Sequence, residues 1–318
     1  MLDQIRALPK AELHLHIEGT LEPELAFTLA RRNGIRLRFE SVQDLARAYD
    51  FAGLQSFLNL YYECMAVLTG PEDFTDLADA YLARAALDGV THAEIFFDPQ
   101  AHTSRGVALD DVVAGLRAAV LAAPARHGVS ATLIACFVRD RPVAEAMTTL
   151  EGIARHLDVI KGVGLDSAEV GNPPSAFRDV FAAAEELGLH KVAHAGEEGP
   201  PAYVWEALDI LGVERVDHGI RSVEDQALLR RLASDQLPLT VCPLSNVKLR
   251  AVESIEDHPL PRLLDAGVMV TLNSDDPAYF GGYIADNYLA VARAHGLDLE
   301  TLAALARNSV RAAFGGER

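Results

Sequence analysis

Eight short apolar segments rich in β-branched residues recur along this chain, and amphipathic helical patterns separate most of them. Such alternation, with wholly apolar strands, predicts an α/β protein whose parallel sheet is covered by helices. Eight units in 318 residues favour a closed (β/α)8 barrel, or TIM barrel. The alternative, an open doubly wound sheet, usually carries a glycine-rich phosphate turn after its first strand, and the sequence has none. The predicted strands are Ala11–Ile17, Val90–Phe97, Ser130–Val138, Ile160–Asp166, His190–Gly196, Arg215–Gly219, Pro238–Leu244 and Val268–Asp275.

The interval between the first two predicted strands, residues 18–89, is far longer than one crossover helix requires. Aromatic and leucine side chains between Tyr49 and Tyr62 recur at helical spacing within it. We therefore expect an insertion of extra helices over the barrel mouth, where it could serve as a lid. Because the chain has no repeats, low-complexity tracts or Pro/Ser-rich linkers, residues 1–318 are predicted to form one domain.

The composition argues against two kinds of partner. The formal net charge is −18, whereas nucleic acids and anionic lipid surfaces are bound by clustered lysine and arginine. No run of eighteen apolar residues occurs and the N-terminus lacks an apolar signal core, so no membrane span is expected. The cysteines Cys64, Cys136 and Cys242 lack paired-ligand spacing, which is typical of reduced thiols in the cytoplasm. The number of subunits stays open, with a homo-oligomer as one option.

Two adjacent carboxylates, Asp275 and Asp276, stand where the apolar run of the eighth strand ends, and Pro277 stops the strand. Neighbouring residues that leave a strand point to different sides, so the two carboxylates do not easily serve the same partner. An isolated Asp-Asp-Pro is most often a polar turn that caps the next helix. The alternative is that one carboxylate binds a cation and the other binds a ligand.

Polar groups also end three other predicted strands. The first strand ends in His14 and His16, the fifth in His194 followed by Glu197, and the sixth in His218. In a parallel barrel the carboxyl ends of the strands share one face, and active sites lie there. Each group alone could be a structural histidine bonded to its neighbours. Four polar strand ends at one face are hard to explain by packing, because buried charge without a partner is costly.

Three imidazoles and one carboxylate, with no thiolate, form a ligand set that suits Zn²⁺ and also accepts iron, cobalt or manganese. A His-x-His pair directs both rings to one face of a strand. Glu197 is a candidate general acid if the pocket is dry, whereas its neighbour Glu198 is expected to be a solvated loop carboxylate. His218 could orient the reacting water or take its proton. The residues assigned as metal ligands are His14, His16, His194 and Asp275.

A two-metal site is the rival arrangement. It would need a bridging ligand, commonly a modified lysine, at the end of the fourth strand. That strand ends in Gly164-Leu-Asp-Ser167, and its only lysine, Lys161, lies near the start. A single metal ion is therefore favoured.

With these residues in place, the sequence resembles the adenosine/adenine deaminases of the amidohydrolase superfamily. The matching motifs run in family order through nearly the whole chain. They are Pro9-Lys-Ala-Glu-Leu-His-Leu-His-Ile-Glu-Gly19, His194-Ala-Gly-Glu197, Val216-Asp-His-Gly219, Cys242-Pro-Leu-Ser-Asn246 and Asn273-Ser-Asp-Asp-Pro277. The other zinc deaminase design, with His-x-Glu and Pro-Cys-x-x-Cys motifs, is absent.

The resemblance implies a (β/α)8 barrel with one zinc ion per chain, held by the four ligands assigned above. It also implies hydrolytic deamination, in which oxygen from water replaces the exocyclic amine of a purine and ammonia leaves. Glu197 would protonate the purine ring, His218 would handle the attacking water, and Asp276 would contact the purine. The partner is then a small-molecule aminopurine, and the setting is purine salvage or catabolism.

Two substitutions favour the free base adenine, converted to hypoxanthine, over adenosine. Adenosine deaminases typically carry Asp after the His-x-His pair to hold the ribose, where this chain has Glu18. They typically show Ala-Gly beside the sugar, where this chain has Ala168-Glu169, and the Glu169 side chain is expected to fill that space. The runs Ser274–Tyr283 and His194–Pro201 also resemble the adenine deaminase branch. The alternatives are adenosine or an N6-substituted aminopurine as substrate, and a non-catalytic purine-binding relative.

Overall fold

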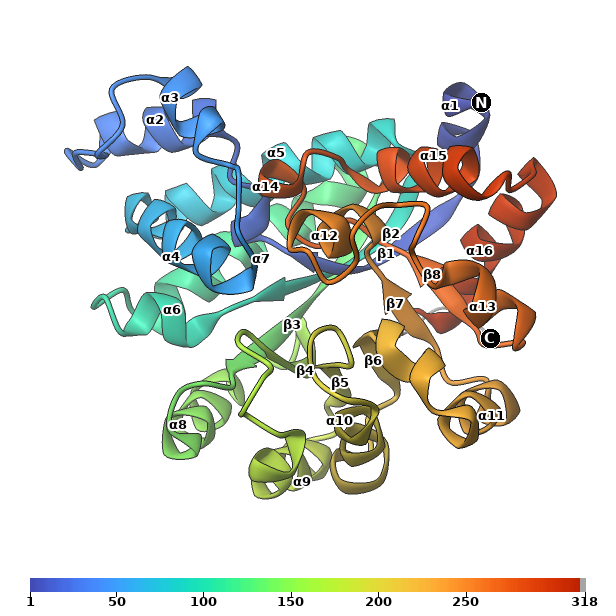
Figure 1. Ribbon diagram of the computed structural model, residues 1–318. Helices are drawn as coiled ribbons and strands as arrows, with labels where there is room; N and C mark the ends of the chain where they lie inside the picture. The colour runs from blue at the N-terminus through green and yellow to red at the C-terminus, as the bar shows by residue number, and fades with distance from the viewer. Residues whose placement is uncertain (315–318) are drawn as a thin grey trace.

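The centre of the molecule is an eight-stranded parallel sheet, seen in a computed structural model that describes residues 1–314. The strands follow one another around the sheet in sequence order, and helices surround them (Figure 1). This is the (β/α)8 barrel that the strand–helix alternation predicts. The strands are β1 (Lys10–His16), β2 (Val90–Phe97), β3 (Ser130–Val138), β4 (Ile160–Asp166), β5 (His190–Ala195), β6 (Arg215–His218), β7 (Leu239–Val241) and β8 (Val270–Leu272).

Helices connect the strands and cover the outside of the sheet (Figure 1). The longer ones are α2 (Pro23–Arg32), α4 (Leu54–Cys64), α5 (Pro71–Leu87), α7 (Leu109–His127), α8 (Val143–Ile153), α9 (Arg178–Glu186), α11 (Gln226–Asp235), α15 (Ile284–His295) and α16 (Leu299–Ala312). The shorter ones are α1 (Leu2–Arg6), α3 (Val42–Arg47), α6 (Pro99–Thr103), α10 (Pro201–Glu206), α12 (Pro243–Lys248), α13 (Leu260–Asp265) and α14 (Pro277–Phe280).

The helices of residues 18–89 take different positions. α5 packs against α7 on the outside of the barrel, as an ordinary crossover helix does. α2 and α3 lie at the periphery, at the upper left of Figure 1. α4 supplies five residues to the wall of the central cavity, namely Leu54, Phe57, Leu58, Tyr61 and Tyr62. Within this interval, α4 is thus the helix that borders the mouth.

Strands β2, β3 and β4 have the predicted bounds, whereas β7 and β8 are shorter than predicted. The backbone leaves the sheet early at both, because it turns to carry polar residues into the mouth. α12 begins directly after Cys242, and Asp275 has a left-handed φ of 63°, which a regular strand does not allow. Both segments stay buried, so their apolar pattern alone does not mark where the strands end.

The seam between β8 and β1 closes the barrel through a single bridge that pairs Leu15 with Asp275. The backbone N–H of His16 donates to the carbonyl oxygen of Asp275 at 3.0 Å. The N–H of Asp275 donates to the carbonyl oxygen of His14 at 3.1 Å. Three of the four residues predicted as metal ligands, His14, His16 and Asp275, therefore lie on the two sides of this seam.

Strand β1 contains a bulge between Glu12 and Leu15, and His14 lies within it. From Glu12 to Leu15, β1 advances by three residues while β2 advances by two. The extra residue disturbs the alternation of side chains on the bulged strand. Glu12 accepts a hydrogen bond from Tyr81 of the outer helix α5 at 2.8 Å, although His14, two residues later, contacts the rings of the central histidines.

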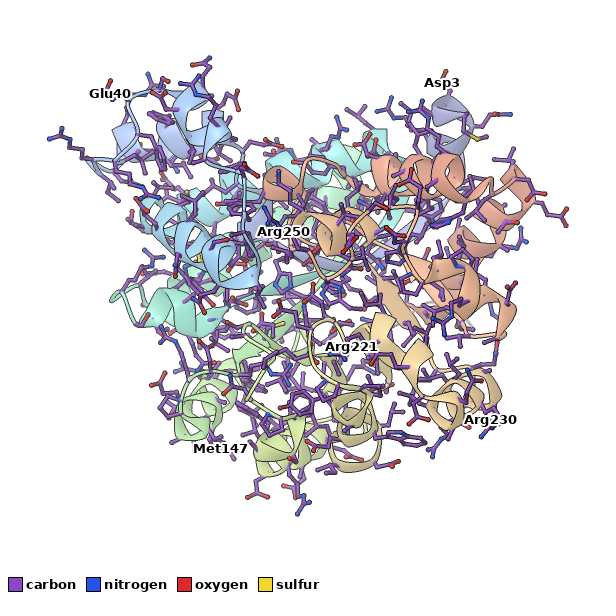
Figure 2. All side chains as sticks on the ribbon, viewed as in Figure 1. Asp3, Glu40, Met147, Arg221, Arg230 and Arg250 are labelled. Atoms are coloured by element: carbon purple, nitrogen blue, oxygen red, sulfur yellow. The ribbon has the colours of Figure 1, made fainter. Side chains whose placement is uncertain are left out.

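Buried apolar side chains fill the space between the sheet and its helices, and Figure 2 shows how densely side chains occupy the interior. The three cysteines are buried and form no disulfide with one another. Among residues 1–314, no helix is both long and apolar enough to cross a membrane.

Candidate active site

Side chains from β1, β5 and the end of β8 meet at the carboxyl end of the barrel. Nε2 of His16 lies 3.2 Å from Nε2 of His194 and 3.6 Å from Oδ1 of Asp275. Nε2 of His14 lies 3.4 Å from the same Oδ1 atom. Within residues 1–314 this buried Nε2 atom has no hydrogen-bond partner. The structure thus brings together all four residues predicted as metal ligands.

The spacing of these atoms fits a metal ion. Zinc–nitrogen bonds of about 2.0–2.1 Å place two ligand atoms of a tetrahedral site roughly 3.3–3.4 Å apart. The three measured separations are 3.2, 3.4 and 3.6 Å, close to that value. A cation between these atoms would give the buried Nε2 of His14 a partner and neutralise the charge of Asp275.

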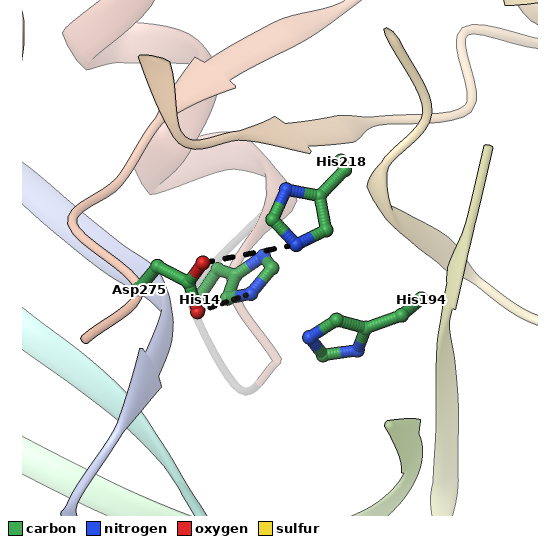
Figure 3. A group of neighbouring side chains, drawn as sticks. All are labelled: His14, His194, His218 and Asp275. Atoms are coloured by element: carbon green, nitrogen blue, oxygen red, sulfur yellow. Dashed lines mark ion pairs between the residues drawn. The ribbon is translucent and has the colours of Figure 1, made fainter. Parts of the chain in front are cut away.

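His218 of β6 lies beside this cluster (Figure 3). Its Nε2 atom is 3.8 Å from Oδ2 of Asp275, and together with His14 and His194 these residues form an alternative group of possible ligands. His16 lies closer to the other predicted ligands, because its Nε2 atom is 3.2 Å from that of His194 and faces Oδ1, the oxygen that His14 also approaches. His218 instead faces Oδ2.

Carboxylates lie on the other side of the imidazole rings, and Nδ1 of His14 also lies 3.0 Å from the hydroxyl oxygen of Thr240. Asp217 of β6 lies 3.9 Å from Nδ1 of His14 and 3.5 Å from Nδ1 of His194. Asp166 of β4 lies 3.6 Å from Nδ1 of His16. Each ring has its Nδ1 side toward a carboxylate and its Nε2 side toward the cluster. Metal-binding histidines are commonly fixed in this way.

Several residues that contact the histidines and aspartates of this cluster were not predicted from the sequence. Ser245 donates to Oδ2 of Asp275 at 2.6 Å, and Thr240 donates to Oδ1 of Asp217 at 2.8 Å. Asp166 and Asp217 lie at strand ends, so the rule that found the histidines also points to them. Ser245 stands within the motif Cys242–Asn246, although the motif alone does not say what it contacts.

Three residues at the mouth have a left-handed backbone. The φ angle is 71° at Ser167, 62° at His218 and 63° at Asp275. Residues other than glycine rarely adopt such angles, and the strain persists only where the surroundings hold it. Such strain gathers at functional sites, which agrees with the position of these three residues in the cavity wall.

The cavity over the cluster is small and partly open to solvent. Helix α4 supplies mainly apolar and aromatic side chains, whereas the strand ends supply polar ones. A concave pocket with a few converging polar groups is the usual form of a small-molecule site. The polar side chains in its wall are His16, Asp98, Asp166, Ser167, His194, Glu197, His218, Asp275 and Asp276.

Glu197 and His218 form a donor and an acceptor in this wall. Burial, reinforced by the charges of Asp275 and Glu169, raises the pKa of Glu197 well above its ordinary value. Burial lowers the pKa of His218 to about 3. Oε2 of Glu197 lies 3.5 Å from Nε2 of His218, and its Oε1 accepts from Asn246 at 3.3 Å. The surroundings therefore favour the protonated form of the Glu197 carboxyl and the neutral form of the His218 imidazole.

The loop that carries Glu197 wraps around a second buried carboxylate, that of Glu169. Its Oε1 atom accepts from the backbone N–H of Gly196 at 2.6 Å. Its Oε2 atom accepts from the N–H groups of Glu197, Glu198 and Gly199 at 3.1, 2.8 and 2.7 Å. A Cβ atom at position 199 would lie 2.4 Å from Oε1, so the wrapped loop requires glycine there.

The sequence predicts that the Glu169 side chain fills the space where adenosine deaminases hold the sugar. The carboxylate turns to the loop, and in the described part of the chain Glu169 is not among the residues that line the central cavity. The physical reason is the demand of four backbone N–H groups for an acceptor.

Glu18 also turns away from the cavity. Its Oε1 atom lies 2.7 Å from Nε2 of His102 and accepts from the backbone N–H of Asp98 at 3.1 Å. It is absent from the cavity wall as far as residues 1–314 define that wall.

The adjacent carboxylates that follow β8 contact different groups, as expected. Asp275 faces the imidazoles, and Asp276 lines the cavity.

The rival two-metal site lacks its bridging lysine in the described chain. Lys161 is exposed, and its Nζ donates to the carbonyl oxygen of Leu157 at 2.9 Å. A further acidic cluster does exist, formed by His16, Asp98 and Asp166, whose nearest side-chain atoms lie within 4.8 Å of one another. It shares His16 with the main cluster.

Comparison with known proteins identifies the family. The family profile described as adenosine deaminase matches residues 9–317. The chain belongs to the adenosine deaminase family. The resemblance inferred from the sequence motifs is thereby confirmed.

Members of this family that are named adenine deaminases are highly similar to the chain. The adenine deaminase of Streptomyces coelicolor is 65% identical over 98% of this chain and 92% of its own length. The adenine deaminase of Caulobacter vibrioides is 56% identical over 98% of this chain and 90% of its own length.

Solved structures of family members confirm the barrel. The adenine deaminase of Arthrobacter aurescens matches with a TM-score of 0.96 at 55% identity, covering 97% of this chain and 94% of that one. An amidohydrolase from Burkhoderia ambifaria with bound Zn matches with a TM-score of 0.90 at 28% identity, covering 98% of this chain and 87% of that one.

Proposed function

We propose that this chain is a zinc-dependent deaminase that hydrolyses adenine to hypoxanthine and ammonia. The observation that carries the proposal is the buried meeting of the four predicted ligands beside Glu197, at the floor of a small-molecule cavity. Adenine as the substrate is supported by the relatives named adenine deaminases, at 65% and 56% identity.

The donor set supports one zinc ion per chain, held by His14, His16, His194 and Asp275. Imidazole and carboxylate ligands are usual for catalytic zinc, and the structure with bound Zn from Burkhoderia ambifaria supports the choice of metal. A bound zinc ion supplies Lewis acidity and lowers the pKa of water to about 7.

The residues of the cavity wall would move the protons. The protonated carboxyl of Glu197 would donate to the ring nitrogen next to the amine-bearing carbon, which makes that carbon more electrophilic. Neutral His218, 3.5 Å from Glu197, would accept a proton from the attacking water. A C–O bond forms, the C–N bond breaks, and the amine leaves as ammonia after it receives a proton. Asp276 would contact the purine.

We further propose that the chain works as one domain in the cytoplasm, within purine salvage or catabolism.

Helix α4 places Phe57, Leu58 and Tyr61 in the cavity wall, so it would lie against a bound base. Aromatic side chains in such a wall stack on purine rings favourably.

The test is ammonia release from purified, zinc-loaded protein given adenine, adenosine or N6-methyladenine. We expect adenine to have the highest kcat/KM. A higher value for adenosine or the substituted base would keep the reaction class and overturn the substrate. If the zinc-loaded protein releases ammonia from none of the three compounds, the proposal of an enzyme is overturned and a non-catalytic purine-binding protein is favoured.

Replacing Glu197 by Gln tests the proposed acid. Glu197→Gln should lower kcat roughly 10²–10⁴-fold while zinc and adenine still bind, because general acid catalysis contributes about that much. The matched control is Glu198→Gln, which changes the next side chain, partly exposed outside the cavity, and should leave kcat nearly unchanged. Equal kcat values for both variants would reject Glu197 as the acid.

A further inference from the structure

We propose that Asp98, beside Asp166, forms a subsite that accepts a hydrogen bond from the imidazole-ring N–H of the free purine base. This subsite would select the free base against purines that carry a substituent on that nitrogen. The inference rests on the proposed function and names the residues that set its substrate preference.

Two carboxyl groups from different strands meet in the cavity wall. Asp98 follows β2 and Asp166 ends β4, and each is 2% exposed. Both line the central cavity, and their nearest carboxylate atoms lie within 4.8 Å of each other. The structure thus places two acidic side chains against a small-molecule cavity and away from bulk water.

One oxygen of each carboxyl lacks a partner. Among the described residues, Oδ1 of Asp98 and Oδ1 of Asp166 have no hydrogen bond. The same part of the chain offers no lysine or arginine within 4 Å of either carboxyl, and Asp166 faces the carboxyl of Asp98 and the Nδ1 atom of His16, the latter at 3.6 Å. The nearby hydroxyl groups of Tyr62 and Ser167 bond to each other at 3.2 Å. A buried pair of carboxyls without a cationic partner is costly, so a donor from a ligand would stabilise this wall.

The order of strands around the barrel says which edge of a ligand meets this wall. In a ring of eight strands, β2 lies opposite β6 and β4 lies opposite β8. His218 ends β6 and Asp275 follows β8, while Asp98 and Asp166 lie at the opposite strand ends. A purine whose amine-bearing carbon faces the β6–β8 side therefore turns its far, imidazole edge toward Asp98.

The chemistry of that edge differs between a free base and a nucleoside. Adenine carries an N–H group on its imidazole ring, whereas adenosine has a glycosidic bond at the corresponding nitrogen. A nucleoside would leave the Asp98 carboxyl buried without a donor. Glu18, at the position where adenosine deaminases typically hold the ribose through Asp, points away from the cavity and lies 2.7 Å from Nε2 of His102. Sites built around one substrate N–H discriminate against analogues that lack it by about 10⁴–10⁵-fold.

Asp98→Leu tests the subsite, because leucine keeps the branched shape and removes both acceptor oxygens. Its kcat/KM should be measured with adenine and with 9-methyladenine, beside the wild type. The wild type should strongly prefer adenine. The kcat/KM of Asp98→Leu should fall roughly 100-fold or more for adenine and less than about threefold for 9-methyladenine. The preference for adenine is then lost. An unchanged preference would overturn the inference and leave the deaminase standing.

Two controls separate the other outcomes. If wild type releases no ammonia from adenine, the proposed function fails first. If Asp98→Leu does not fold, Asp98→Asn is measured in the same way, and wild-type binding of hypoxanthine is compared with that of 9-methylhypoxanthine. Equal binding of the two products would overturn the subsite. Zinc content gives a further test. If the wild type binds two zinc ions per chain and either Asp98 variant binds one, the subsite is overturned in favour of a second metal ion at the acidic cluster.

Discussion

The two halves of strand β1 both bury polar side chains, yet they satisfy them differently. At the start, Nζ of Lys10 donates to the carbonyl oxygens of Ile5 and Asp88 at 2.9 and 2.6 Å. At the end, the Nε2 atoms of His14 and His16 lie 3.4 and 3.6 Å from the same carboxylate oxygen of Asp275, and that of His16 lies 3.2 Å from Nε2 of His194. Backbone carbonyl groups satisfy Lys10 in the lower half, whereas the upper half contributes to a buried histidine and aspartate cluster that could hold a metal ion.

Burial alone does not distinguish these halves, because Lys10 and His14 are both 0% exposed. The distinction lies in whether the chain supplies partners of the right kind. Buried polar groups are nearly always hydrogen-bonded, so a group whose neighbours cannot bond to it indicates a missing ligand. Lys10 is therefore a structural residue, and His14 belongs to a site.

The largest effect should follow from His194→Ala, which removes one nitrogen of the upper cluster. We expect loss of bound zinc and more than about 100-fold loss of kcat/KM, because even partners of metal ligands are worth about 10–100-fold. His190→Ala is the matched control on the same strand, since its ring is partly exposed and pairs with Glu214 at 2.9 Å. Metal analysis and ammonia release measure both. A full equivalent of zinc in His194→Ala would exclude that residue as a ligand.

Lys10→Met should instead lower stability and leave the site intact. Each carbonyl oxygen left without a donor costs roughly 1–3 kcal/mol of unfolding free energy. Urea denaturation measures the loss, with exposed Lys161→Met as the control that should change stability by less than about 0.5 kcal/mol. Zinc content and kcat should match the wild type. Loss of zinc from Lys10→Met would show that the two halves are not independent.

Glu169→Gln should have an intermediate effect on activity, because it changes a hydrogen-bonded carboxylate that lies next to the site. The amide group replaces one acceptor oxygen by a donor that opposes the loop N–H groups around Glu197. We expect kcat to fall about 10–100-fold through misplacement of the acid, with KM for adenine and zinc content little changed. The preference for adenine over adenosine should stay. A changed preference with normal kcat would return Glu169 to the role expected from the sequence.

The smallest effect is the pH dependence that Lys10 gives to stability. Burial lowers the pKa of Lys10 from 10.5 to about 8. Between these values the unfolded chain binds more protons than the folded one, so the unfolding free energy rises with pH. We expect the wild type to gain about 1–2 kcal/mol relative to Lys10→Met between pH 8 and 10. A relative loss over this window would contradict the lowered pKa.

The sequence predicts much of the barrel and its ligand cluster because two simple rules apply. Apolar runs locate the strands, and the carboxyl ends of parallel strands share one face, which brings His14, His194 and Asp275 together. The same rules do not locate the bulge between Glu12 and Leu15, which comes from pairing with β2. The direction of Glu12 is therefore clear only in the structure.

Side-chain directions within the mouth are the part that patterns could not predict. Glu18 and Glu169 both follow strands, but His102 and the N–H groups after β5 decide where their carboxylates point. Asp98 and Asp166 satisfy the strand-end rule as well. A single carboxylate at a strand end is common, and only the structure shows that these two meet with unpartnered oxygens in the described chain.

The seam between β1 and β8 has a consequence for synthesis of the protein. His14 and His16 leave the ribosome early, whereas Asp275 leaves it after most of the chain has been made. The ligand set therefore cannot assemble on a nascent chain until the last strand has been translated and has docked against the first. A zinc ion bound at that stage would link the first strand to the last through its ligands. A product truncated before Asp275 would lack this link.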